Sequence, residues 1–176
     1  MDVFQEPRAV MTFATELGWM AALGRGRLLE RLTFGHANPQ RALNYLPADE
    51  VADARVTNWW PDLVDRLVAY ASGGRDDFRD VEISCEHLTP FQTKVVAACR
   101  AIPYGEKRSY GEVAELAGSP RAARAVGNVM ANNRLAIVVP CHRVIAAGGA
   151  PGGYSAGEGV RTKLRMLETE SRTAGA

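Results

Sequence analysis

The residues with the clearest capacity for chemistry are the consecutive Cys141, His142 and Arg143. A thiol becomes an effective nucleophile when a base, a nearby positive charge or hydrogen bonds to sulfur favour the thiolate, and a histidine and an arginine follow this cysteine. Neighbours in an extended chain point to opposite faces, so a water molecule can relay the proton between Cys141 and His142. Asn133 and Glu168 are candidates to orient these groups. A bare Cys-His pair is more often a core cysteine beside a surface histidine, and the surrounding elements decide between these interpretations.

The other two cysteines give weaker signals. Cys99 recurs with apolar residues at helical spacing, which indicates a small buried side chain. Cys85 and His87, with the distant His36, lack the second pair of ligands that a closed zinc site needs, so we predict neither a metal nor another cofactor. Three cysteines with no CxxC pair, and no secretory signal before them, predict reduced thiols and a cytoplasmic protein.

Composition and charge favour a globular protein that binds a polyanion. The 176 residues are 47% hydrophobic and 23% charged, and no apolar run approaches the roughly 20 residues that cross a membrane. Residues 1–88 carry 9 Lys and Arg against 14 Asp and Glu, a net charge of −5, whereas residues 89–176 carry 12 against 6, a net charge of +6. The second half therefore has the sign that nucleic acid binding requires.

The first half has the pattern of a small antiparallel sheet with two helices. The predicted strands cover residues 9–15, 18–23 and 28–34, with a last strand through Phe78, Val81 and Ile83. The predicted helices cover about 39–46 and 61–72, and the second carries an apolar stripe of Leu63, Leu67 and Tyr70. Trp59 and Trp60 precede that helix, and we interpret them as core residues rather than as a platform for stacked bases.

A helix-turn-helix pair is expected in the second half. Thr89 and Ser109 each open a capping box, which starts one helix at about residue 90 and another at about residue 110. A further helix over about 120–131 follows a turn, and it carries Arg121 and Arg124 among small side chains. Small side chains permit close approach to a neighbouring helix or to a DNA groove, and the two arginines favour the groove.

The segment before the cysteine is a run of five apolar residues, 135–139. Its β-prone residues predict a buried strand or extended segment that ends at Pro140 and delivers Cys141. A glycine-rich loop and a last helix at about 160–169 complete the chain.

The motif Pro140-Cys141-His142-Arg143-Val144 resembles the signature of the O6-alkylguanine-DNA alkyltransferases, also called methylated-DNA–protein-cysteine methyltransferases. Other segments resemble the same family in order and spacing, namely 102–106, 108–112, 123–127, 153–155 and Glu168. The resemblance is specific over about residues 89–169 and looser before them. It implies a two-domain fold of the α+β or α/β class. Residues 1–88 are the implied ribonuclease-H-like domain, which holds the small antiparallel sheet, and residues 89–176 are the implied winged-helix-like DNA-binding domain.

The resemblance also implies an activity in DNA repair. The alkyl group of O6-alkylguanine moves from double-stranded DNA to Cys141 in a permanent thioether, so one molecule repairs one lesion without a cofactor. The protein then binds the minor groove as a monomer and flips the damaged nucleotide out of the duplex. O4-alkylthymine is a second substrate that the resemblance leaves open.

Residue roles follow from the same resemblance. His142 is the implied water-relayed base, Glu168 its orienter, Asn133 a support for the active-site turn, and Tyr110 the group that protonates or hydrogen-bonds the leaving guanine. Arg124 fills the gap in the base stack. The other implied DNA contacts are Arg121, Ala123 and Ser109, and the implied pocket residues are Val144, Tyr154, Ser155 and Ala156.

The sequence departs from the family pattern at three positions. Ala97 replaces a frequent aromatic residue, Ala156 stands where glycine is usual, and Arg134 stands where proline commonly follows the asparagine. A Cβ at Ala156 restrains the pocket loop if that position needs a positive φ. At Arg134, contact with a phosphate and simple solvation are equally good interpretations.

Two other functions share part of the pattern. A non-catalytic module that binds alkylated bases needs the helix-turn-helix, but the non-catalytic relatives in this family lack the cysteine found here as Cys141. A cysteine hydrolase with a Cys-His-Glu triad uses the same nucleophile, but it turns over repeatedly and leaves the helix-turn-helix without a role.

Overall fold

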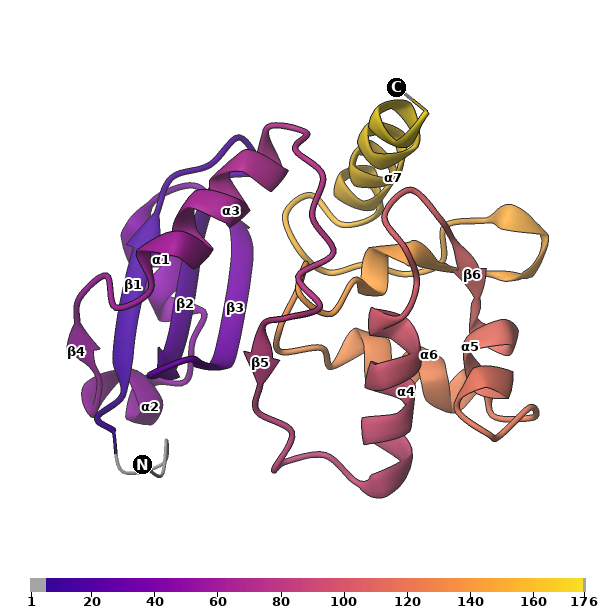
Figure 1. The fold of residues 1–176 in the computed structure, drawn as a ribbon, viewed down its shortest axis with the longest axis horizontal. Helices are drawn as coiled ribbons and strands as arrows, with labels where there is room; N and C mark the ends of the chain where they lie inside the picture. Colours follow the sequence, from indigo (N-terminus) through magenta and orange to yellow (C-terminus); the bar gives the residue numbers. More distant parts are fainter. Residues whose placement is uncertain (1–5, 176) are drawn as a thin grey trace.

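The first half of the chain is built on a five-stranded mixed sheet, seen at the left of Figure 1. The computed structural model describes residues 6–175. The strands are β1 (Ala9–Phe13), β2 (Trp19–Arg25), β3 (Leu28–His36), β4 (Arg55–Val56) and β5 (Glu82–Ile83), in the order β4-β1-β2-β3-β5. The predicted antiparallel meander of the first three strands is confirmed, while β4 and β5 add short parallel edges.

The predicted last strand of this half is mostly wrong. Only Glu82 and Ile83 pair with β3, because Phe78 has a φ of 48° and turns its ring into the core instead of extending the chain. A positive φ is incompatible with a regular strand. The apolar residues at positions 78 and 81 therefore signalled burial and not a sheet.

Helices cover both faces of this sheet. They are α1 (Pro39–Asn44), α2 (Ala48–Ala52) and α3 (Pro61–Ala71). The side chain of Asn38 caps α1 by accepting from the Arg41 amide, and Leu63, Leu67 and Tyr70 form the buried stripe of α3. Leu46 and Ala42 of the α1 segment pack on one face of the sheet with a small apolar cluster, and α3 packs on the other face with the main core.

The second half is mainly helical and lies at the right of Figure 1. Its elements are α4 (Pro90–Arg100), β6 (Arg108–Ser109), α5 (Tyr110–Leu116), α6 (Ala123–Ala131), η2 (Cys141–Arg143), β7 (Val144–Ile145), η3 (Ala147–Gly149) and α7 (Val160–Ala174). Both predicted capping boxes are present, at Thr89 and at Ser109. The second helix of the helix-turn-helix starts at Ala123, so Arg121 lies in the preceding turn and not in the helix.

The apolar run before Cys141 is not a strand. Leu135 makes a single bridge to Leu32, Ala136 makes one to Val139, and the chain turns between them with a φ of 75° at Ile137. The Val139 amide closes this turn by donating to the Leu135 carbonyl at 2.8 Å. All five residues of the run 135–139 are buried, which explains why they are hydrophobic. An apolar run indicates burial but does not distinguish a tight turn from a strand.

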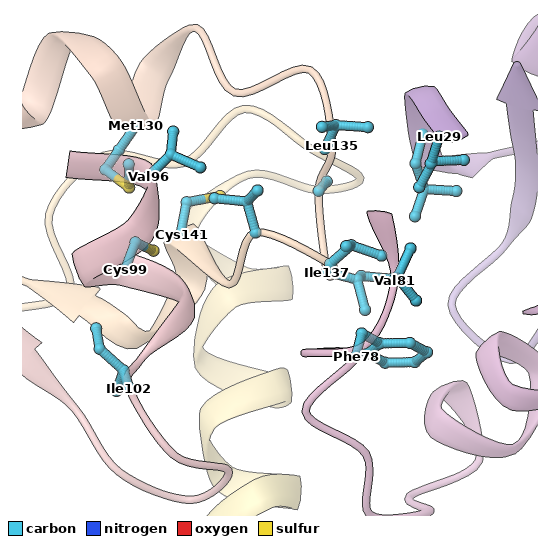
Figure 2. Close-up of a cluster of buried hydrophobic side chains, with 14 of the residues drawn as sticks. Leu29, Phe78, Val81, Val96, Cys99, Ile102, Met130, Leu135, Ile137 and Cys141 are labelled. Carbon is cyan, nitrogen blue, oxygen red and sulfur yellow. The ribbon is translucent and has the colours of Figure 1, made fainter. Parts of the chain in front are cut away.

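One apolar cluster joins the two halves. Figure 2 shows part of it, where Leu29 and Val81 from the first half belong to the same buried group as Leu135, Ile137 and Cys141. Cys99 also lies in this core and is fully buried, as its helical spacing predicted. Trp60 is buried and Trp59 donates from its indole nitrogen to the Gly26 carbonyl at 3.1 Å, so both are structural residues. No helix within residues 6–175 is long and apolar enough to cross a membrane.

Candidate active site

Cys141 lies at the wall of a cleft of about 690 Å³ between the two halves of the chain. It is 7% exposed and starts the short helix η2. The Asn133 side-chain amide donates to Cys141 Sγ at 3.1 Å and to the Val139 carbonyl at 2.9 Å, and its oxygen accepts from the Leu135 amide at 3.0 Å. Asn133 thus binds the backbone at both ends of the turn 135–139, which precedes Cys141.

Burial raises the pKa of the Cys141 thiol above its ordinary value, although the hydrogen bond from Asn133 and the positive charge of Lys163 act in the opposite direction. The thiol is therefore the resting form at neutral pH. A reaction at this sulfur needs a group that accepts its proton.

His142 is paired with Glu170 and not with Glu168. His142 Nε2 lies 2.8 Å from Glu170 Oε1, and both residues are buried. The buried residues of α7 are Lys163, Met166 and Glu170, which recur at helical spacing on one face, whereas Glu168 is two positions away from that face and exposed. The prediction of Glu168 as the orienter of His142 is wrong for this reason.

Glu170 is held as a carboxylate by several donors. The Tyr70 hydroxyl donates to Oε1 at 2.6 Å, Arg143 Nε donates to Oε2 at 2.9 Å, and the Gly105 amide donates to Oε2 at 3.2 Å. Burial favours the neutral acid, but the hydrogen bonds from His142 and Arg143 and the charge of Arg143 hold the pKa of Glu170 well below its ordinary value.

The charge of Glu170 fixes the tautomer of His142. A carboxylate can only accept hydrogen bonds, so His142 Nε2 carries the proton and Nδ1 carries the lone pair. Burial lowers the pKa of His142 below its ordinary value, against the effect of Glu170, so the ring is neutral at pH 7. Nδ1 is buried without a hydrogen-bond partner within residues 6–175, which leaves it free to act as a base.

Arg143 binds the carboxylate of Glu170 and makes no hydrogen bond to Cys141 Sγ within residues 6–175. It is 2% exposed and donates to both oxygens of Glu170, to Asp77 Oδ1 at 2.9 Å and to the Ile102 carbonyl at 2.8 Å. These four bonds hold the guanidinium as the counter-ion of Glu170.

Several residues of this network were not predicted from the sequence. Tyr70 was assigned only to the apolar stripe of its helix, and Lys163 was not singled out. The ammonium of Lys163 is buried, donates to the Val144 carbonyl at 2.6 Å and lies 5.9 Å and 5.8 Å from the ring centres of Tyr110 and Tyr154. The i, i+4 and i, i+7 spacing of Glu170 from Met166 and Lys163 was the available signal for the buried face of α7.

The predicted pocket residues mostly line the cleft beside Cys141. Tyr154, Ser155 and Ala156 do so, and so does Tyr110, the predicted donor to the leaving guanine. Burial raises the pKa of both tyrosines, so their hydroxyls keep their protons. Val144 is not among the lining residues, because its side chain is fully buried in the main core, and its carbonyl accepts from the Lys163 ammonium. Ala156 does not have a positive φ, so its Cβ does not strain the loop.

The first half of the chain supports the pocket loop directly. A Cβ on Gly35, at the end of β3, would lie 2.4 Å from the Cα of Gly157, so the two backbones are in contact. Leu32, Thr33, Tyr45 and other residues of this half also line the cleft. The cleft is therefore formed by both halves.

The helix-turn-helix lies along the other side of the cleft. Gly127, Met130 and Ala131 of α6 are among the lining residues. Arg124 is exposed on the first turn of α6, Arg121 is exposed in the turn, and Ala123 is half-buried as the first residue of the helix. Ser109 caps α5 by accepting from the Glu112 amide at 3.1 Å.

The candidate metal ligands His36, Cys85 and His87 do not form a cluster that could bind a metal ion. Among the described residues no group of three His, Cys, Asp or Glu side chains could hold a metal ion, and His36 Nε2 instead lies 2.7 Å from Thr33 Oγ1.

Fold and site together define a protein with a cysteine at a cleft beside a helix-turn-helix, adjacent in sequence to a neutral histidine that pairs with a buried carboxylate. Residues 90–172 match the family model described as 6-O-methylguanine DNA methyltransferase, DNA binding domain. The chain is 43% identical over 148 residues to the methylated-DNA–protein-cysteine methyltransferase of Mycobacterium tuberculosis, covering 81% of this chain and 86% of that protein. It therefore belongs to the methylated-DNA–protein-cysteine methyltransferase family.

Other relatives agree with this assignment. The constitutive methylated-DNA–protein-cysteine methyltransferase of Bacillus subtilis is 51% identical over 105 residues, covering 60% of this chain and 62% of that protein. The crystal structure of Mycobacterium tuberculosis OGT in complex with DNA is similar with a TM-score of 0.76 and 37% identity over 93% of each chain. The mixed α/β fold of the chain is thus that of the known structures of this family.

Proposed function

We propose that this protein repairs DNA by moving the alkyl group of O6-alkylguanine to Sγ of Cys141, once per molecule. The observation that carries the proposal is the hydrogen-bonded pair of Glu170 and His142, adjacent in sequence to Cys141, whose sulfur Asn133 holds at the cleft. The family of the chain and the name of its relatives support the same reaction.

The proton of the thiol leaves first. His142 Nδ1 has its lone pair available and accepts the proton through a bridging water, and Glu170 then stabilises the imidazolium that forms. Sγ attacks the alkyl carbon, the bond between that carbon and O6 breaks, and its electron pair stays on the guanine. Tyr110, whose raised pKa keeps its hydroxyl protonated, donates to the leaving base. The thioether is permanent, so the protein is consumed.

The DNA enters along α6. In this proposal α6 lies in the minor groove, Arg124 fills the gap left by the flipped nucleotide, and Arg121, Ala123 and Ser109 lie at the backbone. The exposed arginines and the net charge of +6 in residues 89–176, from 12 basic against 6 acidic residues, support this face as the DNA side. The same cleft serves O4-alkylthymine if that base is flipped in the same way.

We assign residues 1–88 to a ribonuclease-H-like domain and residues 89–176 to a winged-helix-like domain, on the basis of the five-stranded sheet and of the helix pair α5 and α6 with the β6-β7 ladder. We further propose that the protein acts as a monomer in the cytoplasm, where a reducing environment keeps Cys141 as a thiol.

The proposal is tested by incubating the protein with duplex DNA that contains one O6-methylguanine. The expected result is a mass increase of one methyl group on the peptide that contains Cys141, at no more than one equivalent. Cys141→Ser should still bind the duplex but leave the lesion unrepaired. Repeated turnover would indicate a hydrolase, and an intact lesion with wild-type protein would indicate a module that only binds alkylated bases.

A further inference from the structure

Arg134 occupies a rigidly held position beside the nucleophile. It directly follows Asn133, whose amide donates to Cys141 Sγ. The Arg134 carbonyl accepts from the Leu32 amide at 2.9 Å, and the next residue, Leu135, bridges to Leu32. The backbone from which this side chain projects is therefore fixed by both halves of the chain.

The guanidinium of Arg134 is exposed at the rim of the cleft that contains Cys141. Within residues 6–175 it has neither an ion pair nor a side-chain hydrogen bond. The nearby carboxylate of Glu50 is already engaged, because Arg31 donates to both of its oxygens at 2.8 Å and 2.6 Å. Arg31 and Glu50 cancel in charge, so Arg134 leaves an uncompensated positive charge at the rim.

The rim lies where the backbone of a flipped nucleotide must pass. A base that reaches Cys141 enters beside α6, and the phosphates on either side of it stay at the mouth of the cleft. Residues 124 to 131 span about 10 Å along α6, at 1.5 Å per residue, which corresponds to about three phosphate steps on one strand. Arg134 follows the end of α6, so it reaches a different part of the backbone from Arg124.

We propose that Arg134 binds a DNA backbone phosphate next to the flipped nucleotide, and so positions that nucleotide at Cys141. This inference rests on the proposed function, since it takes the cleft as the site of the flipped base. An arginine suits this role because its planar guanidinium donates two parallel hydrogen bonds to phosphate oxygens. The contact is independent of sequence and adds affinity without discriminating bases.

The experiment measures binding of the wild-type protein, Arg134→Ala and Arg134→Lys to a duplex with one O6-methylguanine at several salt concentrations. Loss of one phosphate contact should reduce the slope of log K against log salt by about 0.9 and weaken binding most at low salt. Arg134→Lys keeps the charge and should retain most of the slope. The matched control is Arg172→Ala, which removes an exposed arginine on α7 that does not line the cleft.

A wild-type slope in Arg134→Ala, or an equal reduction in Arg172→Ala, would overturn the proposal. The concentration of DNA that gives half-maximal methyl transfer provides a second measurement, and it should rise about 10-fold in Arg134→Ala, which corresponds to about 1.4 kcal/mol for one lost phosphate contact. Failure of the proposed function is distinguishable, because it would abolish methyl transfer by the wild-type protein, whatever the salt slopes of the variants.

Discussion

His142 Nε2 and Glu170 Oε1 are 2.8 Å apart in a region where both side chains are almost fully buried. The pair is 28 residues apart in sequence and joins η2 to the last helix of the chain. Because Glu170 keeps its charge, the histidine presents the unprotonated Nδ1 away from the pair. The chemistry proposed for Cys141 depends on this arrangement.

Glu170→Gln should reduce the rate of methyl transfer about 100-fold or more, because a neutral amide neither fixes the tautomer of His142 nor stabilises its protonated form. Single-turnover transfer from O6-methylguanine duplex measures the effect. The control is Glu168→Gln, an exposed position on the same helix, which should keep the wild-type rate and a stability within about 0.5 kcal/mol. The opposite ranking of the two variants would restore Glu168 as the orienter.

Asn133→Ala should slow transfer and destabilise the fold by about 1–3 kcal/mol, since it leaves buried polar groups of the active-site turn unpaired. It also removes the donor to Cys141 Sγ, so the thiol pKa should rise further. Urea denaturation and the pH dependence of iodoacetamide alkylation measure the two effects. Asn132→Ala, at the exposed neighbouring position, should change neither. An unchanged thiol pKa in Asn133→Ala would contradict the assigned hydrogen bond.

Tyr70→Phe tests whether the first half of the chain contributes to the site. Its hydroxyl donates to Glu170 at 2.6 Å, and the loss of a bond to a charged group should cost about 1.5–3 kcal/mol of unfolding free energy. Denaturant unfolding gives this value directly. Tyr45→Phe removes the hydroxyl of a tyrosine that is 63% exposed, and it should have almost no effect. Equal stabilities of the two variants would show that the Tyr70 bond is not formed.

Stability should fall as the pH is lowered from 7 towards 4. The folded protein lowers the pKa of His142, so below the ordinary histidine value the unfolded state binds more protons and is favoured. Glu170 also has a lowered pKa, and its contribution is present above the ordinary carboxyl value and is lost as the pH falls further. Melting temperatures between pH 4 and 8 measure this dependence of stability on pH. His142→Asn should make the dependence weaker near pH 6.

His36 and His87 supply the control for this pH series. Burial lowers the pKa of each of them as well, but both are more exposed than His142. His87→Asn should therefore change the slope less than His142→Asn does. An equal effect of the two substitutions would mean that the buried pair does not dominate the pH dependence.

The local elements were largely predictable from the sequence. The capping boxes at Thr89 and Ser109 and the start of α1 at Pro39 were confirmed, because each signal is satisfied within a few residues. Segments whose shape depends on distant contacts were not. The apolar run 135–139 forms a turn that is bridged to β3 through Leu135 and Leu32, and the strand predicted through Phe78 is mostly absent.

The sequence by itself determined the family and the helix-turn-helix, and it predicted Cys141 as the nucleophile beside His142, because these depend on residue types at short spacings. Only the tertiary structure decided which carboxylate serves His142. Glu168 and Glu170 both lie on α7, and the choice depends on which face of that helix packs against the core. The contact of Tyr70 with Glu170 spans 100 residues, and no local pattern in the sequence encodes a pair that only the packing of the two halves brings together.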